Sequence, residues 1–283
     1  MSRADSDPLR SALDSWLAPD AGADVVLLAV SGGPDSTALM HAAAAYGRRD
    51  ALHVATVDHG LRTDSTAEAA TVGRAAEALG LRHAILPWTG SKPASGLQAA
   101  ARAARYRLLA AHARAIGAGL VLTGHTLDDQ AETVLMRLLG GSGPAGLAGM
   151  RVERALAPGL RLARPFLAIP KADLVAWCEA RGIAYLRDPS NADDRFARAR
   201  LRALQPLLER EGLTAARLAR LAERAARDED ALQAAASAAF AAADLQAGSN
   251  EPRSAHFPPP PAGEGGPRAK SGDGSAVSGE VAP

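Results

Sequence analysis

The sequence predicts an α/β protein built on a parallel twisted sheet with helices on both faces. Short apolar runs typical of buried strands alternate with longer helical runs through the first half of the chain. The composition is 47% hydrophobic but only 4% aromatic, and alanine is abundant, which favours helices packed on a sheet. Glycine-rich turns and polar residues follow the strand-like runs, where open parallel sheets bind their ligands.

Strand-like and helical runs alternate in a regular order. The strand-like runs are Val25–Val30, Leu52–Val57, His83–Leu86 and Leu120–Thr123. The helical runs that follow them are Asp35–Tyr46, Ser65–Leu79, Leu97–Ile116 and Leu127–Leu139. Because a helix returns the chain after each strand, the strands are expected to run parallel, with their carboxyl ends at one edge of the sheet.

The regular signals become weaker beyond residue 139. Gly140–Gly146 is too rich in glycine for a helix and is expected to be a loop. An extended piece near Leu160–Arg164 and a helix over Lys171–Ala180 follow it.

The chain is expected to contain three segments. Residues 1–200 hold the motifs described below and form the main domain. Residues 201–246 are rich in alanine and predict a small α-helical appendage with a break at Gly212. Residues 247–283 are rich in Pro, Gly, Ser and charge and hold almost no large apolar side chain, so a disordered tail is expected.

Charge and cysteine content exclude several classes of protein. The formal net charge is +1, so any surface for nucleic acid must be local. The single cysteine, Cys178, excludes a disulfide framework, a zinc ribbon and a mechanism that needs a C-x-x-C pair. No apolar run approaches transmembrane length, and residues 1–7 lack the apolar core of a signal peptide. We therefore expect a soluble, cytoplasmic protein with no membrane partner.

The first strand-like run ends in a glycine turn with a helix directly behind it. The turn reads Ser31-Gly32-Gly33-Pro34-Asp35-Ser36. The missing Cβ atoms let backbone amides face a ligand, and the helix N-terminus adds its dipole, so the turn is expected to bind an anion. Pro34 and Asp35 stand where the lysine of a G-x-x-x-x-G-K-[ST] loop would be expected. An ordinary strand–helix turn is the alternative interpretation.

The fourth strand-like run is followed by a group of carboxylates. Thr126 and Asp129 have the spacing of a helix-capping pair, so a purely structural role for Asp129 is one interpretation. The helical period also places Asp128, Asp129 and Glu132 on one arc. Because three carboxylates repel one another unless a cation joins them, Mg²⁺ is expected here. His125 is expected to contact substrate.

Two further groups of polar residues are candidates for nucleotide contact. His59 and Arg62 follow the second strand, at the edge where the ligand is expected. Arg102, Arg105 and Tyr106 share a helix face, which is either a solvated surface or a contact to phosphate and developing charge.

An arginine-rich stretch follows the turn Asp188-Pro189-Ser190-Asn191. It is interpreted as a surface for a nucleic-acid backbone, although the turn alone is common in proteins. Its candidate tRNA-binding residues are Arg195, Arg198, Arg200 and Arg202.

Together these strings resemble the tRNA(Ile)-lysidine synthase family of the N-type ATP pyrophosphatases. They occur in the family's order and span about residues 25–202. The matching strings are Val30–Ser36, Val57–Arg62, Ala101–Tyr106, Gly124–Thr133 with Leu135–Leu139, and Asp188–Asn191 with its arginines. The resemblance implies an adenine nucleotide alpha-hydrolase-like, Rossmann-like fold.

The resemblance also implies a reaction. ATP adenylates the base carbonyl oxygen of the wobble cytidine in a tRNA(Ile) with the anticodon CAU, and pyrophosphate leaves. The ε-amine of free L-lysine then attacks the activated carbon, and AMP leaves. Such an enzyme is a ligase that forms a carbon–nitrogen bond and uses ATP and Mg²⁺.

Site roles follow from the same resemblance by motif position. Ser31 through Ser36 would hold the phosphates, with Asp35 and Asp129 as metal contacts. The catalytic residues would be Arg105, His125, Asp129 and Glu132. Arg105 would steady the charge on the phosphate, and the other three would handle the lysine amine and the metal.

The chain departs from the family pattern at two positions and in its C-terminal region. Thr126 stands where many relatives have a second histidine, and Gln98 where they have a glutamate. Larger relatives carry folded C-terminal domains, whereas the sequence after Ala247 is of low complexity. A cytidine or uridine thiolase, which a lone cysteine disfavours, and a nucleotide-binding module without chemistry are the alternatives. A homodimer is left open.

Overall fold

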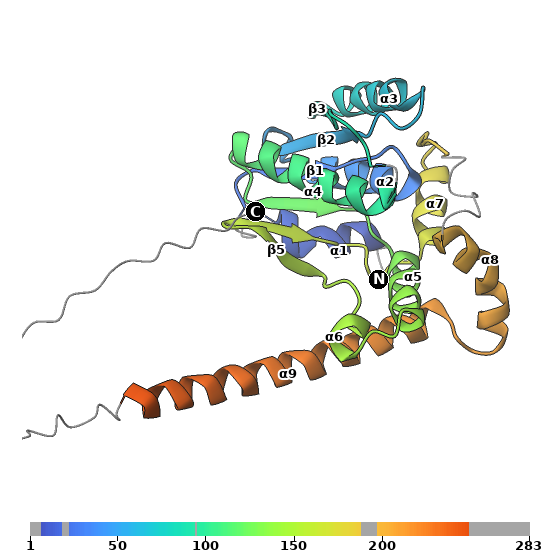
Figure 1. Cartoon of the computed structure of the whole chain (residues 1–283). Coiled ribbons are helices and arrows are strands. Elements are labelled where there is room, and N and C mark those ends of the chain that lie inside the picture. Colours follow the sequence, from blue (N-terminus) through green and yellow to red (C-terminus); the bar gives the residue numbers. More distant parts are fainter. Residues whose placement is uncertain (1–6, 19–22, 94, 188–196, 249–283) are drawn as a thin grey trace, which may run out of the picture. The chain divides into compact units, whose positions relative to one another are not determined.

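The structure is a computed structural model that describes residues 7–18, 23–93, 95–187 and 197–248 (Figure 1). Its contacts divide the chain into two units, residues 1–235 and 236–283. The described part of the second unit is helical throughout. Nearly all of the predicted tail over residues 247–283 lies outside the described residues.

Within the described residues, one six-stranded sheet has the order β3-β2-β1-β4-β6-β5. The strands are β1 Val26–Ala29, β2 Leu52–Asp58, β3 Arg82–Pro87, β4 Leu120–Thr123, β5 Glu153–Ala157 and β6 Leu160–Ala163. The first five strands in this spatial order run parallel, and β5 pairs antiparallel with β6 at one edge. The predicted parallel sheet is confirmed, and β5 is an addition that the sequence did not predict.

Helices cover both faces of this sheet (Figure 1). They are α1 Pro8–Leu17, α2 Pro34–Ala44, α3 Ser65–Ala78, α4 Leu97–Ala115, α5 Leu127–Leu139, α6 Pro144–Leu147, α7 Lys171–Glu179, α8 Ala197–Arg210 and α9 Ala215–Gly248, with a short 3₁₀ turn at Arg49–Ala51. Helices α1, α2, α3 and α7 share one apolar core with the sheet. Helix α4 packs in a second core on the opposite face. Neighbouring strand residues divide between them, since Leu27 belongs to the second core and Leu28 to the first.

Most predicted boundaries are correct to within one or two residues, and the ranges of β4 and α5 agree fully with the prediction. The predicted loop over Gly140–Gly146 is wrong at its end, because Pro144 begins the single turn of α6 after Gly143. Helix α1 was not predicted, although Asp7 caps it and its leucines at helical spacing are buried. The predicted break at Gly212 is confirmed, with the glycine at φ +83° between α8 and α9.

The strand order reverses beside β1. Strand β1 pairs with β2 on one side and with β4 on the other, and the chain reaches β4 only after β3 at the far edge of the sheet. Ligands of open parallel sheets bind in the crevice that such a reversal leaves. The connections that follow β1 and β4 touch here, because a Cβ on Gly124 would lie 2.7 Å from the backbone oxygen of Asp35. Glycine at this position therefore lets the two motifs approach each other.

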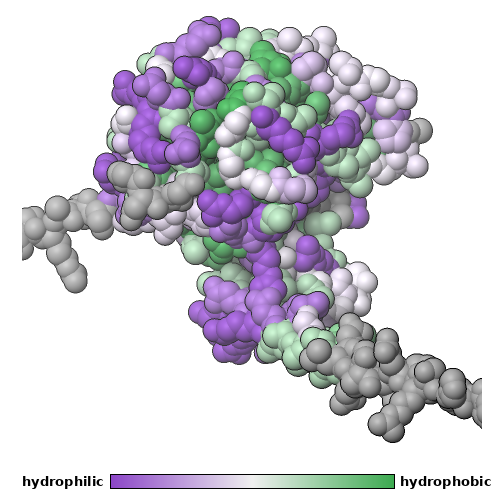
Figure 2. Space-filling view, turned by 90° about the vertical axis from the view of Figure 1, so that its left-hand side faces the viewer, coloured by the Kyte–Doolittle hydropathy of each residue, from purple (hydrophilic) through white to green (hydrophobic). Residues whose placement is uncertain are grey.

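The surface mixes polar and apolar side chains. On the face shown in Figure 2, hydrophilic side chains border an apolar strip of the first unit. In the described part of the chain, no helix is both long enough and apolar enough to cross a membrane.

Candidate nucleotide and active site

The turn after β1 is tied together by its own hydroxyl groups. The Ser36 Oγ accepts a hydrogen bond from the Ser31 amide at 3.1 Å and donates to the Gly33 carbonyl at 3.1 Å. The Thr37 hydroxyl donates to the Gly32 carbonyl at 3.1 Å. Gly33 occupies the N-cap of α2 and has no side chain to cap it. The first amides of α2 can therefore serve an anion, as the sequence predicts.

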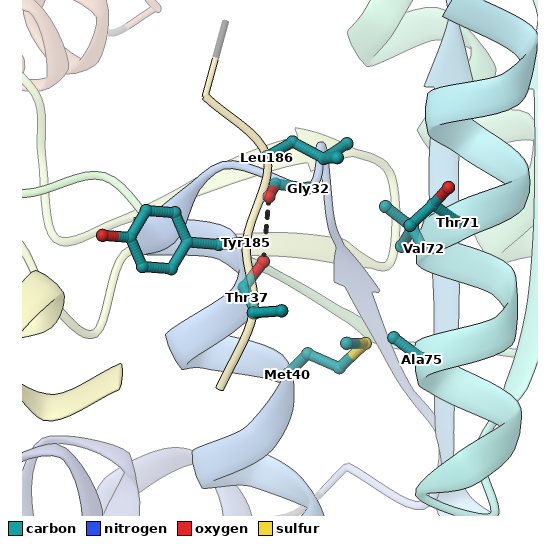
Figure 3. Close-up of a pocket in the computed structure, with 9 residues that line it drawn as sticks. Gly32, Thr37, Met40, Thr71, Val72, Ala75, Tyr185 and Leu186 are labelled. Atoms are coloured by element: carbon teal, nitrogen blue, oxygen red, sulfur yellow. Dashed lines mark hydrogen bonds between the residues drawn. The ribbon is translucent and has the colours of Figure 1, made fainter. Parts of the chain in front are cut away.

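A later segment crosses this turn. The Leu186 amide donates to the Gly32 carbonyl at 2.8 Å. Gly32 has φ +91°, and a Cβ there would lie 2.6 Å from Leu186 Cδ1. Figure 3 shows Leu186 over Gly32, with Met40 and Val72 lining the space behind. Only glycine fits both the backbone conformation and the close approach at position 32.

The space behind the turn is a small apolar cavity. It has a volume of about 90 Å³ and lies between α2, α3 and the segment at 184–186 (Figure 3). Ligand pockets usually measure about 300–1,000 Å³. This cavity is therefore a packing gap behind the turn and is too small for a nucleotide.

Asp35 is the most buried charge of the turn. Its side chain is 18% exposed, and its Oδ2 lies 2.7 Å from Lys171 Nζ. Its other oxygen, Oδ1, is buried and has no hydrogen-bond partner among the described residues. Burial raises the pKa of this carboxyl, Lys171 lowers it, and the nearby Asp129 and Asp128 raise it further. Asp35 thus presents a buried oxygen atom that a cation would satisfy.

Lys171 is a site residue that the sequence analysis missed. It is the first residue of α7, and its amide donates to Asp128 Oδ2 at 2.7 Å. The preceding turn is fixed as well, because the Leu127 amide donates to the Ile169 carbonyl at 3.0 Å. Lys171 and Asp35 are 136 residues apart in the chain, and no local motif marks the lysine. The sequence held no signal for this contact.

Asp129 caps α5. Its Oδ2 accepts from the Thr126 amide at 3.0 Å, and its own amide donates to Thr126 Oγ1 at 3.3 Å. This capping box confirms the structural interpretation of the pair. The cap does not exclude a second role for Asp129, because the Asp129 carboxylate is close enough to Asp35 to raise the pKa of Asp35. The catalytic and metal roles of Asp129 stay predictions.

Glu132 is paired with an arginine from α8. Its side chain is only 7% exposed, and Arg202 Nε and Nη2 lie 2.5 Å and 3.3 Å from its two oxygens. The pair joins two residues for which the sequence predicted separate roles, in catalysis and in tRNA binding. Arg202 is directed at Glu132 in this structure, and both roles stay predictions.

The carboxylates fit a magnesium ion only together with ligands from a substrate. No cluster of three or more His, Cys, Asp or Glu side chains suited to a metal exists among the described residues. Asp35 and Asp129 remain as neighbours, and Asp35 Oδ1 lacks a partner within the described chain. Magnesium usually takes one or two carboxylates plus phosphate oxygens. The donor set is consistent with that pattern.

Two histidines near Arg105 have lowered pKa values and are neutral at pH 7. Burial is the main cause that lowers the pKa of His125 to about 4, and its Nδ1 lies 2.8 Å from Thr123 Oγ1. Burial is also the main cause that lowers the pKa of His59 to about 4, and the positive charge of Arg105 is the second cause. The Nδ1 atom of His59 has no hydrogen-bond partner among the described residues. Arg105 also lowers the pKa of His125. The structure therefore brings Arg105 together with both histidines.

Two arginines that were not predicted, Arg154 and Arg164, lie near the predicted Arg102 and Tyr106. Arg164 is 2% exposed and donates to the Arg151 carbonyl at 2.6 Å. Arg102 and Arg154 lie over the ring of Tyr106, at 5.2 Å and 5.1 Å from its centroid. Arg154 and Arg164 belong to the hairpin of β5 and β6 or its end. Arg154 was not predicted because β5 was not, whereas Arg164 ends the predicted extended piece near Leu160–Arg164 and no motif marked it.

The structure describes only some of the remaining predicted residues. Arg62 forms an ion pair with Glu68 of α3 at 2.7 Å, with 36% of its side chain exposed. Arg195 lies outside the described residues. Arg198 and Arg200 belong to α8, and Arg200 is exposed. Their proposed contact with tRNA stays a prediction.

Comparisons with known proteins agree with this geometry. The PP-loop domain model matches residues 7–208. The tRNA(Ile)-lysidine synthase of Methylobacterium nodulans is 61% identical over 236 residues, which cover 83% of this chain and 69% of that protein. The synthase of Rhodopseudomonas palustris is 55% identical over 237 residues, or 81% of this chain and 68% of that protein.

A solved structure is similar in fold. It is the U34-tRNA thiolase NcsA from Methanococcus maripaludis, with a TM-score of 0.65 and 18% identity over 77% of this chain and 78% of that one. At this identity the likeness concerns the fold alone. On the PP-loop match and the identities to the synthases, the chain belongs to the tRNA(Ile)-lysidine synthase family.

Proposed function

We propose that this protein is a tRNA(Ile)-lysidine synthase that acts in the cytoplasm. It joins free L-lysine to the wobble cytidine of tRNA(Ile) with the anticodon CAU and converts ATP to AMP and pyrophosphate. The observation that supports this function best is the contact between the phosphate-binding turn and the β4–α5 connection at Gly124. The contact supports an anion site beside His125 and the carboxylates of α5.

The first step joins the cytidine to AMP. The base carbonyl oxygen attacks the α-phosphorus, and the bond from that phosphorus to the pyrophosphate oxygen breaks. The amides at the start of α2 hold the phosphates, and the guanidinium of Arg105 steadies the negative charge that grows on them. AMP is a far better leaving group than oxide, so the second step becomes feasible.

In the second step, the lysine ε-amine attacks the activated carbon and AMP leaves. The ε-ammonium must first lose a proton, because only the neutral amine has a free electron pair. The carboxylate of Asp129 attracts the ammonium and takes its proton. His125 stays neutral at pH 7, since its pKa is about 4, and it therefore does not repel the incoming cation.

Asp35 and Asp129 would hold Mg²⁺ in this site. The ion, when bound, neutralises charge on the phosphate oxygens. Within the described part of the chain, Oδ1 of Asp35 is a buried carboxylate oxygen without a hydrogen-bond partner.

Thiolase chemistry is disfavoured by the one cysteine. Cys178 is buried in α7, and burial raises the pKa of its thiol to about 11, so it carries little thiolate at neutral pH. The lysine-incorporation experiment below distinguishes the proposed ligase from a nucleotide-binding module without chemistry.

The proposal is tested by incorporation of radiolabelled lysine into a CAU-anticodon tRNA(Ile) transcript. Label is expected only when ATP, Mg²⁺ and this tRNA are all present, and not with an elongator tRNA(Met) transcript. Binding of ATP without any label would contradict the proposed ligase and favour a nucleotide-binding module.

A further inference from the structure

The phosphate-binding turn has no lysine of its own, yet a lysine ammonium lies against it. Lys171 Nζ is 2.7 Å from Asp35 Oδ2, and Asp35 lies in the first turn of α2. An anion bound to the first amides of α2 would sit at the same helix end. The ammonium group therefore stands beside the expected position of the phosphates.

The backbone of Lys171 is held firmly while its side chain can change partner. Its amide is bonded to Asp128, and the residue two positions before it is bonded to Leu127. The side chain of Lys171 is 43% exposed, so its ammonium keeps contact with solvent at the crevice. A half-exposed ion pair of this kind contributes little to stability. A role in holding the fold is thus a weak explanation for it.

The other lysine in the described part of the chain does not offer the same group. Lys92 and Lys270 are the remaining lysines of the sequence. Lys92 Nζ donates to the Gly60 carbonyl at 2.8 Å and lies over the ring of Trp88. Lys270 lies outside the described residues.

We infer that Lys171 is a phosphate-binding residue of this site, which Asp35 holds in position while no nucleotide is bound. When ATP binds with Mg²⁺, Asp35 meets the metal ion and Lys171 transfers to phosphate oxygens. The exchange keeps both charges paired before and after binding. This inference rests on the proposed function, because it assumes that the turn binds ATP.

Equilibrium binding to the full chain tests the inference. Calorimetry with Mg²⁺-pyrophosphate, Mg²⁺-ATP and AMP compares the unchanged protein with Lys171→Met and Lys171→Arg. Arg161→Met is the matched control, because Arg161 is 44% exposed, pairs with Glu153, and lies at the opposite strand ends. We expect Lys171→Met to weaken pyrophosphate and ATP binding about 10- to 100-fold, the effect of one lost hydrogen bond to a charged group. AMP binding should change less than about twofold, and Lys171→Arg should restore most of the affinity.

A second measurement needs no variant and so does not depend on the folding of one. Limited acetylation of the unchanged protein, followed by peptide mass spectrometry, reports the reactivity of each lysine. Mg²⁺-pyrophosphate should protect Lys171 and leave Lys270 as reactive as before. Equal pyrophosphate affinity in Lys171→Met, or equal acetylation of Lys171 with and without pyrophosphate, would overturn the inference. Failure of the unchanged protein to bind ATP would instead reject the proposed function, and the inference with it.

Discussion

Arg202 of α8 neutralises Glu132 of α5, with the shorter of its two contacts at 2.5 Å. Glu132 is almost fully buried, so its charge depends on this single arginine and on further contacts inside the site. The pair links the helix that carries the predicted catalytic carboxylates to the helix that carries the predicted tRNA-binding arginines. A change in α8 can therefore reach the predicted catalytic residue Glu132.

Removal of Arg202 should destabilise the protein. We expect Arg202→Ala to lower the free energy of unfolding by about 1–3 kcal/mol, because the buried Glu132 loses its ion pair with Arg202. The double variant Glu132→Gln/Arg202→Met should recover part of that loss. Urea unfolding measures both, and Arg62→Ala serves as control, since its partner Glu68 is more exposed and the loss should stay below about 1 kcal/mol. An equal loss in Arg202→Ala and Arg62→Ala would contradict this account.

Gly32→Ala should impair the phosphate-binding turn. The substitution places an alanine in a backbone conformation that is strained for it and brings its Cβ against Leu186. We therefore expect the free energy of unfolding to fall by about 1–3 kcal/mol and ATP binding to weaken. Gly47→Ala is the matched control, because Gly47 also has a positive φ but has open space around it. Leu186→Ala combined with Gly32→Ala should restore part of the loss. An equal loss of unfolding free energy in Gly32→Ala and Gly47→Ala would show that the close contact with Leu186 has no effect.

Asp129 has a capping role and a proposed catalytic role, and one pair of variants separates them. Asp129→Asn keeps a capping side chain, so we expect unfolding free energy to fall by less than about 1 kcal/mol. Lysine transfer should fall about 100-fold or more, because the amide cannot accept the proton of the lysine ammonium. Thr126→Ala removes the opposite half of the cap and is the control. Loss of activity in proportion to stability in both variants would leave Asp129 with the structural role alone.

The lowered pKa of His125 predicts that the protein loses stability in acid. The pKa of His125 is about 4 in the folded protein and about 6.5 in the unfolded chain. Above pH 6.5 the imidazole is therefore mostly neutral in both states, and protonation costs the folded protein no stability. Stability is therefore lost as the pH falls from about 6.5 towards 4, because the unfolded chain binds the proton first. Between pH 7.5 and 5.5 the free energy of unfolding should fall by about 1 kcal/mol less in His125→Gln than in the unchanged protein, as measured by urea unfolding. A pH dependence unchanged by the substitution would contradict the burial of a neutral imidazole.

Local signals in the sequence were sufficient for the strand–turn–helix unit of β1 and α2 and for α5. A strand, two glycines and a helix are adjacent in the chain, and the Thr126–Asp129 cap marks the start of α5. The partners of these motifs could not be predicted. Lys171 and Arg202 reach Asp35 and Glu132 from 136 and 70 residues away, and only the packing of α7 and α8 brings them close. The same holds for Arg164, whose place depends on an edge strand with little apolar character.

The most direct test of the central claim measures lysine transfer and pyrophosphate release in the same reaction of the full chain. The account predicts equal amounts of labelled lysidine and pyrophosphate, both lost in Arg105→Ala and both kept in Arg161→Met. Pyrophosphate release without lysine transfer, or transfer that persists in Arg105→Ala, would contradict a single site that activates the cytidine and then joins lysine to it.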